Sequence, residues 1–170
     1  MNTGRASPSS LPDRTSGQCW TRLPTRQLGN GTRTSRLAVG FDDGDGGFLA
    51  LVVAARGDRF TLGVQLVEVR PVLDGEQDPR LGQILIDGRT RRFGLARTAW
   101  RSTTRTTLTT LFTCDHDLLV QALLRGRLLV VTLEGRRFRA ALGSLREPLA
   151  DALRDVCDPE QLPLARWLAD

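Results

Sequence analysis

The sequence predicts an α+β protein, built mainly as an antiparallel β-sandwich or a partly open barrel, with two short helices in its C-terminal half. Three observations predict this class. From residue 37 onward, short apolar segments recur between turns that contain Gly and Asp. Residues 97–113 alternate along an extended stretch rich in β-branched threonine. Two later segments repeat apolar residues at helical spacing instead.

The strand signals follow one another along the chain. The turn at residues 42–47 predicts a hairpin, because Asp and Gly tolerate the backbone conformations of tight turns. Phe60, Leu62, Val64 and Leu66 share one face of an alternating strand. Residues 97–113 are too many for one ordinary strand, so we expect a bend near 102–106. The expected strands are 37–41, 48–55, 60–69, 81–86, 91–96, 97–113 (bent), 127–133 and 137–142.

Two helices are expected in the C-terminal half. Asp115 is placed to cap a helix that ends at Gly126. Residues 144–147 read Ser-Leu-Arg-Glu, which predicts a capping box that opens a second helix ending at Cys157. A further helical turn is expected near Trp167.

The domain organisation expected is a flexible basic arm at residues 1–36 and a single globular domain at residues 37–170. The arm is rich in Ser, Thr, Gly, Pro and Arg and has no strand or helix periodicity. Within it, Cys19-Trp20 is expected to pack on the fold. No apolar run is long enough to span a bilayer, and the first 16 residues lack the apolar segment of an intact signal peptide.

The charge is segregated along the chain. All 24 basic residues are arginine, which is typical of a GC-rich genome and also suits bidentate recognition of anions. Residues 41–79 hold three arginines against eight acidic residues, whereas residues 80–139 hold twelve against four. We expect these segments mainly to balance one another in the fold, although a basic segment also attracts nucleic acid, acidic lipid or acidic protein.

No motif in the sequence predicts catalysis, a metal or a cofactor. His116, between Asp115 and Asp117, is interpreted as part of a helix start, since no activated nucleophile accompanies it. The sequence lacks phosphate-binding glycine loops, and three cysteines with one histidine do not make a zinc site. The turn at 42–47 resembles a calcium loop, but Ala54 occupies the position of the bidentate Glu. The sequence therefore predicts a non-enzymatic protein.

Arginines in the basic segment are the candidate partner-binding residues. A row along one strand face with two flanking clusters could contact phosphates or acidic side chains. The alternative is a solvated outer sheet face, which strands with one wet side normally show. The candidates are Arg91, Arg92, Arg97, Arg101, Arg105, Arg136, Arg137 and Arg139.

The C-terminal half resembles a bacterial family. The resemblance covers roughly residues 84–157 and rests on the pattern Ile86-Asp87-Gly88, Trp100, 118–124, Gly126, 128–131, Phe138, 142–144 and Cys157. This pattern is similar to that of small envelope proteins of the invasion-associated locus B type and the type VI secretion-associated proteins allied to them. The resemblance implies a β-sandwich-like core and a periplasmic or secreted location.

The chain departs from this family at two points. No signal peptide is visible, and residues 60–69 lack the cysteine that family members tend to pair with the terminal one. The resemblance implies that Cys157 either pairs with Cys114 or Cys19 or stays reduced. Cys114 and Cys157 are the candidate pair for one disulfide if the protein lives in an oxidising compartment.

Three functions remain as hypotheses. The first is a binding or accessory protein of a bacterial secretion or envelope system that acts through a protein partner. The second is a cytoplasmic nucleic-acid-associated or phage-type accessory protein that uses an arginine-rich sheet face. The third is an immunity or inhibitor protein. The sequence does not specify the partner or an oligomeric state.

Overall fold

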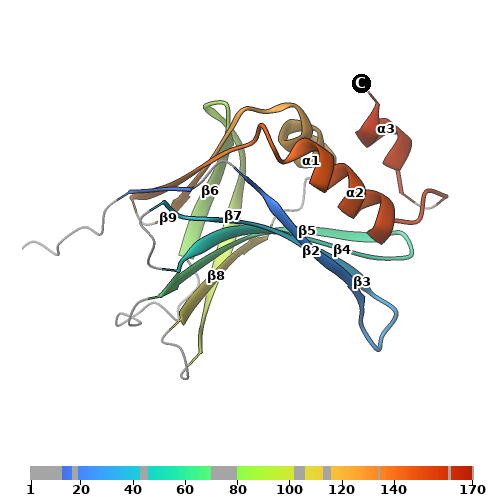
Figure 1. The fold of residues 1–170 in the computed structure, drawn as a ribbon, viewed down its shortest axis with the longest axis horizontal. Coiled ribbons are helices and arrows are strands. Elements are labelled where there is room, and N and C mark those ends of the chain that lie inside the picture. The colour runs from blue at the N-terminus through green and yellow to red at the C-terminus, as the bar shows by residue number, and fades with distance from the viewer. Residues whose placement is uncertain are drawn as a thin grey trace, which may run out of the picture.

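A computed structural model describes residues 13–16, 19–42, 46–69, 80–101, 106–112, 116–133, 135–160 and 162–169. Over these residues the chain forms ten strands and three helices (Figure 1). The strands are β1 (Arg14–Thr15), β2 (Thr21–Gln27), β3 (Arg33–Gly40), β4 (Phe48–Arg56), β5 (Arg59–Val69), β6 (Arg80–Ile86), β7 (Arg89–Arg101), β8 (Thr106–Phe112), β9 (Leu128–Leu133) and β10 (Arg136–Ala141). The helices are α1 (His116–Arg125), α2 (Arg146–Val156) and α3 (Leu164–Leu168). The predicted α+β class, mainly antiparallel and open with helices in the C-terminal half, is confirmed.

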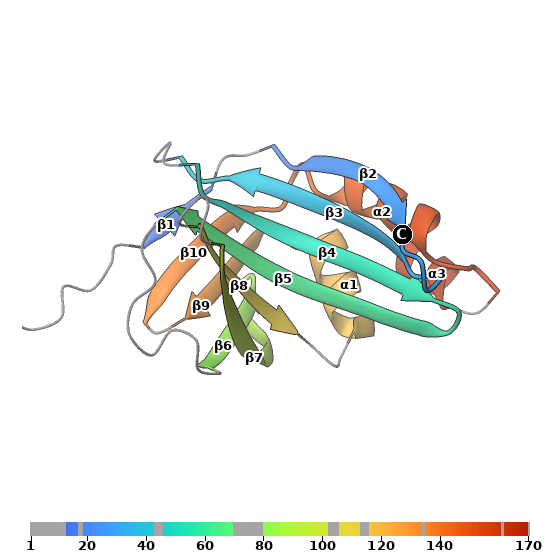
Figure 2. The same ribbon diagram turned by 90° about the horizontal axis from the view of Figure 1, so that it is seen from below.

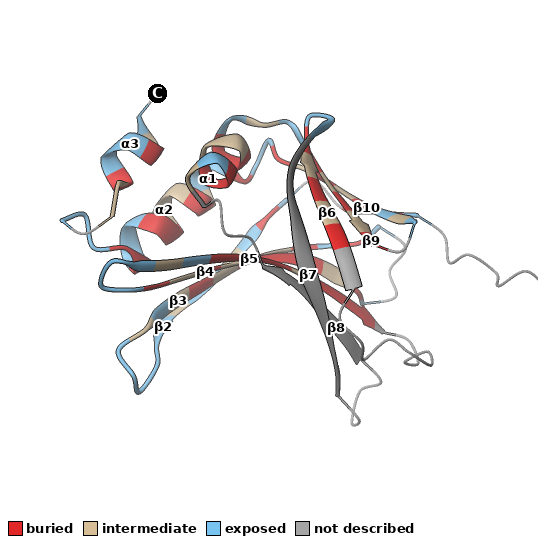
Figure 3. Cartoon of the chain, turned by 180° about the vertical axis from the view of Figure 1, so that it is seen from behind, coloured by how far each residue is buried: buried red, intermediate tan, exposed pale blue. Residues whose placement is uncertain are grey.

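The strands form one hydrogen-bonded ladder in the order β1-β10-β9-β6-β7-β8-β5-β4-β3-β2. Among the described pairs only β1 and β10 run parallel. The ladder bends sharply, so β6, β9 and β10 stand at an angle to the layer made by β2 to β5 (Figure 3). Helices α1 and α2 lie in that angle, over the concave side of the β2–β5 layer (Figures 1 and 2).

The hydrophobic core fills the concave side of the bent sheet. Alternate residues of β3, β4 and β5 are buried there, because successive strand residues point to opposite faces. The apolar stripe of α2 covers them, as the spacing in the sequence predicts. Core side chains that are essentially inaccessible include Leu37, Leu49, Leu51, Leu62, Leu66, Ile84, Leu123, Phe138, Leu149, Leu153 and Trp167.

One end of the ladder closes on itself through β1. Ser16, just after β1, forms a bridge to Phe41, the residue that follows β3. The Ser16 N–H donates to the Arg139 carbonyl at 2.8 Å, and the Asp42 N–H donates to the Thr15 carbonyl at 2.9 Å. Residues 14–16 therefore join β10 to the end of β3, while β2 forms the other end of the ladder, with no further strand paired to it among the described residues.

The expectation that residues 1–36 form a flexible arm is wrong for the described residues from 13 onward. Residues 14–16 close the ladder, and β2 and the start of β3 belong to the sheet. Trp20 is buried, as expected, and its indole N–H donates to the Ala141 carbonyl at 2.8 Å. No residue of β2 is buried, and its inward side chains Arg22 and Thr25 make polar contacts with Asp155, so β2 resembles an unstructured segment in composition.

The predicted capping box is also wrong. Helix α2 begins after Leu145, which makes no side-chain capping bond. The Ser144 hydroxyl instead accepts the Trp20 backbone N–H at 3.1 Å. Cys157 ends the helix as predicted, and its N–H donates to the Leu153 carbonyl. Among the described residues, no helix has the length and apolar character to cross a membrane.

Candidate functional site

The β2–β3 hairpin presents a surface that faces away from the helices. Its turn is tight, with the Leu28 N–H donating to the Thr32 carbonyl at 2.8 Å and Gly31 at a φ of 82°. The Asn30 side chain accepts the Thr32 N–H at 3.0 Å and fixes the turn. We call the side of β2 to β5 turned away from α2 the outer face.

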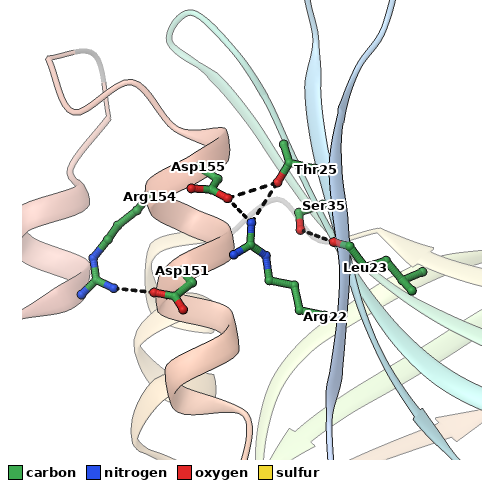
Figure 4. Close-up of polar contacts among 7 residues, drawn as sticks. All are labelled: Arg22, Leu23, Thr25, Ser35, Asp151, Arg154 and Asp155. Carbon is green, nitrogen blue, oxygen red and sulfur yellow. Dashed lines mark hydrogen bonds and ion pairs between the residues drawn. The ribbon is translucent and has the colours of Figure 1, made fainter.

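A β-bulge in β2 decides which of its side chains reach the outer face. The pairing with β3 is interrupted between Leu23 and Arg26, so Pro24 lies at an irregular point where a missing N–H is tolerated. Arg22 and Thr25 both point toward α2, where the Arg22 guanidinium binds the Asp155 carboxylate (Figure 4). The Leu23 side chain points away from α2.

A hollow of about 290 Å³ lies beside this bulge on the outer face. Leu23 and Leu28 are 42% and 49% exposed there, a large fraction for leucine side chains. The Ser35 hydroxyl donates to the Leu23 carbonyl at 3.4 Å, so both of these polar groups already have a partner (Figure 4). The residues that line the hollow are Leu23, Pro24, Arg26, Leu28, Thr34, Ser35 and Arg36.

Four arginines share the outer face around this hollow. Direct cross-strand partners lie on one face of a sheet, and the pairs Leu23–Arg36, Arg26–Thr34 and Arg56–Arg59 place these four arginines on the same face. Small side chains, Val52 and Ala54, lie beside them on β4. In the described part of the chain, Arg26, Arg36, Arg56 and Arg59 form no ion pair.

The local sequence leaves this charge almost uncompensated. Between Arg14 and Phe41 there is no acidic residue, and between Gly46 and Arg59 there is only Asp58. The outer face therefore combines positive charge with exposed apolar side chains. Such a combination suits an acidic ligand that also carries an apolar group.

The three predicted arginines on β10 do not all point to the same face of the sheet. Arg137 and Arg139 alternate with Arg136, and Arg136 points inward. Its guanidinium donates to both oxygens of Glu68, at 2.8 and 3.2 Å, and its side chain is only 12% exposed. The Arg136 side chain is therefore held in a buried ion pair, and its contact with a partner stays a prediction.

This buried ion pair belongs to a cluster between β1, β5 and β10. Arg14 also contacts Glu68, with 3.4 Å between Nη1 and Oε1. The Arg14 guanidinium lies 4.1 Å from the centre of the Phe41 ring, and the Arg136 guanidinium lies 4.8 Å from that of Phe138. The cluster joins the two layers of the bent sheet, and its role is structural.

The other predicted arginines are only partly placed. Arg91, Arg92, Arg97 and Arg101 lie on β7, which is separated from β10 by β6 and β9. The structure describes the backbone of this strand and its pairing, and Arg105 lies outside the described residues. Binding through the β7 arginines stays a prediction, but β7 and β10 are not adjacent strands.

The cysteines give no evidence of a bridge among the described residues. Cys157 is a free, buried thiol and Cys19 is a free, exposed one. Burial raises the pKa of the Cys157 thiol to about 11, against an opposing effect of the Arg33 charge. Cys114 lies outside the described residues, so the Cys114–Cys157 pairing stays a prediction.

Asp117, next to His116, and Asp87 both make structural contacts that hold elements of the fold together. Asp117 accepts the Trp167 indole N–H at 3.0 Å and forms an ion pair with Arg166, which fastens α3 to α1. Asp87, at the β6–β7 turn, accepts the N–H groups of Arg127 and Leu128. No group of three metal-ligating side chains occurs among the residues that the structure describes.

Sequence reasoning missed the outer face. Part of its signal was present, because Arg26 and Arg36 lie in a stretch, residues 20–40, that holds no acidic residue, but the assignment of residues 1–36 to an arm concealed it. No protein family model, curated protein or solved structure matches the chain. The resemblance of residues 84–157 to the bacterial envelope family accordingly stays a prediction.

Proposed function

We propose that this protein is a non-enzymatic binding protein whose partner is a protein that carries an acidic segment. The observation that carries the proposal is the outer face, where Arg26 and Arg36 line a hollow with exposed Leu23 and Leu28. Charge complementarity would steer an acidic segment to this face and orient it. The apolar hollow would supply the short-range contact that holds it.

The chemistry of the hollow favours a protein over a nucleic acid. Surfaces that bind single-stranded nucleic acid combine a positive groove with aromatic side chains on which bases stack. The hollow is lined by aliphatic, hydroxyl and arginine side chains, with no aromatic residue among them. Leu23 and Leu28 match an apolar side chain of a protein partner better than they match a base or a phosphate.

The biological setting of the proposal comes from the sequence alone. A role in a bacterial secretion or envelope system, in the periplasm or outside the cell, is implied by the resemblance of residues 84–157. A cytoplasmic nucleic-acid-associated protein is the alternative, and an immunity or inhibitor protein would use the same kind of protein-binding surface. The charge on the outer face is compatible with all three functions, so the first measurement should determine whether the partner is a protein or a nucleic acid.

Two fluorescent probes of similar length and charge distinguish these classes. One is a peptide of about 20 residues that contains glutamates, alanines and one leucine, and the other is a single-stranded oligonucleotide. Binding of each is measured by anisotropy at about 50 and 200 mM salt. The variants are Arg26→Glu/Arg36→Glu and, as a matched control, Arg125→Glu/Arg127→Glu, whose two exposed arginines lie elsewhere on the surface and are not among the predicted binding residues.

We expect the peptide to bind more tightly than the oligonucleotide. The Arg26→Glu/Arg36→Glu variant should lose at least about tenfold in peptide affinity, whereas the control variant should keep it. Tighter binding of the oligonucleotide, with a steep salt dependence, would favour the nucleic-acid function instead. Binding of neither probe would contradict the proposal.

A further inference from the structure

Resting on the proposed function, we infer that the partner segment is an acidic amphipathic helix that inserts one leucine-sized side chain into the hollow beside Pro24. The helix would lie on the outer face and would not extend the sheet as an added strand. The inference depends on the edge of β2, on the shape of the hollow and on the position of the arginines around it.

The edge of β2 is a poor template for an added strand. A partner strand would need a regular row of N–H and C=O groups, but Pro24 has no N–H and the bulge shifts the register between Leu23 and Arg26. The side chains of Arg22 and Thr25 are held by Asp155 on α2. A proline on an edge strand is a common device against strand addition.

The hollow suits one apolar side chain. Leu23, Pro24 and Leu28 provide apolar walls, and their exposure leaves apolar area for a ligand to cover. The buried Ser35 already donates its hydroxyl to the Leu23 carbonyl, so an apolar group that enters the hollow would leave this hydrogen bond intact. A volume of about 290 Å³ accommodates a side chain and not an extended ligand.

The arginines around the hollow favour acidic residues on the partner helix, next to the apolar side chain that enters the hollow. Arg26 and Arg36 line the hollow itself, and Arg56 and Arg59 lie further along the same face. On a helix, residues three and four positions from an anchor share its face, about one turn away. Carboxylates at those positions would meet the arginines. A second copy of the outer face would place arginine against arginine, which disfavours self-association through it.

A peptide series distinguishes a failure of the inference from a failure of the proposed function. The first peptide has about 20 residues of alanine and glutamate with one central leucine. The second has alanine in place of the leucine, and the third keeps the leucine but carries a central proline that breaks the helix. Each is titrated into the unaltered protein, into Leu28→Ser and into Leu118→Ser. Leu118 is an exposed leucine on α1, away from the hollow, and provides the matched control.

We expect the first peptide to bind about tenfold more tightly than either of the others. Leu28→Ser should remove the advantage of leucine over alanine, and Leu118→Ser should preserve it. If the leucine and alanine peptides bind equally, no apolar side chain is inserted into the hollow, and that part of the inference is wrong. The proposed binding of an acidic segment would still hold. If the proline peptide binds as well as the first peptide, the bound segment does not need to be helical, and the proposed helix is wrong. If no acidic peptide binds, both the inference and the proposed function fail.

Discussion

The guanidinium group of Arg136 meets the Glu68 carboxylate across the interior of the bent sheet, with two hydrogen bonds of 2.8 and 3.2 Å. These residues lie on β10 and β5, which are far apart in the ladder. Arg14 contacts the same carboxylate from β1. The cluster therefore holds together the end at which the ladder closes, and it leaves the opposite edge and the outer face available to a partner.

Neutralising Glu68 should destabilise the fold strongly. The Glu68→Gln variant would remove the negative charge that two buried guanidinium groups share, and breaking a buried ion pair on one side costs about 3–5 kcal/mol. Urea unfolding measures the change. The exposed Glu147 on α2 provides the control, and Glu147→Gln should change the free energy of unfolding by less than about 0.5 kcal/mol. Equal effects of the two substitutions would contradict a structural role for the cluster.

The ion pair between Arg22 and Asp155 should contribute far less to the stability of the fold than the buried contacts of Glu68. The two side chains are 26% and 49% exposed, so solvent screens their attraction. We expect Asp155→Asn to lower the free energy of unfolding by no more than about 1 kcal/mol, with a smaller effect in high salt. A loss comparable to that of Glu68→Gln would show that β2 depends on this contact for its place in the sheet.

Gly126 should tolerate no side chain. A Cβ at this position would lie 2.5 Å from the Ile86 side chain and 2.6 Å from the Ala122 carbonyl oxygen. We expect Gly126→Ala to cost about 1–3 kcal/mol through overpacking, measured by thermal or urea unfolding. Gly143→Ala is the matched control, since a Cβ added at Gly143 would meet nothing within 4 Å. A neutral Gly126→Ala would show that α1 and β6 are not in close contact.

The two described thiols should differ in reactivity. Exposed Cys19 should react with iodoacetamide in the native protein, whereas Cys157 should react only after unfolding, because it is buried and its raised pKa keeps it protonated. Mass spectrometry of the alkylated peptides measures this. Rapid native labelling of Cys157 would contradict its burial at the end of α2.

The raised pKa of the Cys157 thiol also predicts that the protein loses stability at alkaline pH. The pKa of Cys157 is about 11 in the folded protein against 9.0 for the unperturbed thiol, so below pH 9 both states keep the proton and stability is unaffected. As the pH rises from 9 to 11, the unfolded thiol ionises first and the free energy of unfolding falls. The chain has no lysine or tyrosine to obscure this titration. Cys157→Ala should remove the decline, and Cys19→Ala should not.

Much of the fold follows from patterns that are local in the sequence. The alternation from Phe60 to Leu66 predicts β5, and the long threonine-rich stretch with a bend predicts β7 and β8. The apolar spacing in α2 predicts its buried stripe of Leu149, Leu153 and Val156. The pattern of each of these elements lies within its own residues, so the sequence of that element is sufficient to indicate it.

The missed features depend on partners far away in the chain. Arg136 differs from its neighbour Arg137 because Glu68 lies opposite it, and no local pattern indicates that pairing. Ser144 accepts a hydrogen bond from Trp20, which competes with its predicted capping role. Strand β2 escapes prediction because its inward side chains are polar and contact Asp155 on α2, so the strand shows no alternation of apolar residues. The outer face depends on that strand and is missed with it.

Photo-crosslinking at Leu28 in the cells that make the protein tests the central claim most directly. A photoreactive amino acid replaces Leu28 beside the hollow, and the same substitution at Leu118 gives the control. We predict a defined adduct at position 28 that maps to an acidic segment of one protein, is absent at position 118 and is lost in Arg26→Glu/Arg36→Glu. An adduct with nucleic acid, an adduct that survives the arginine reversal, or none at position 28 would contradict the claim.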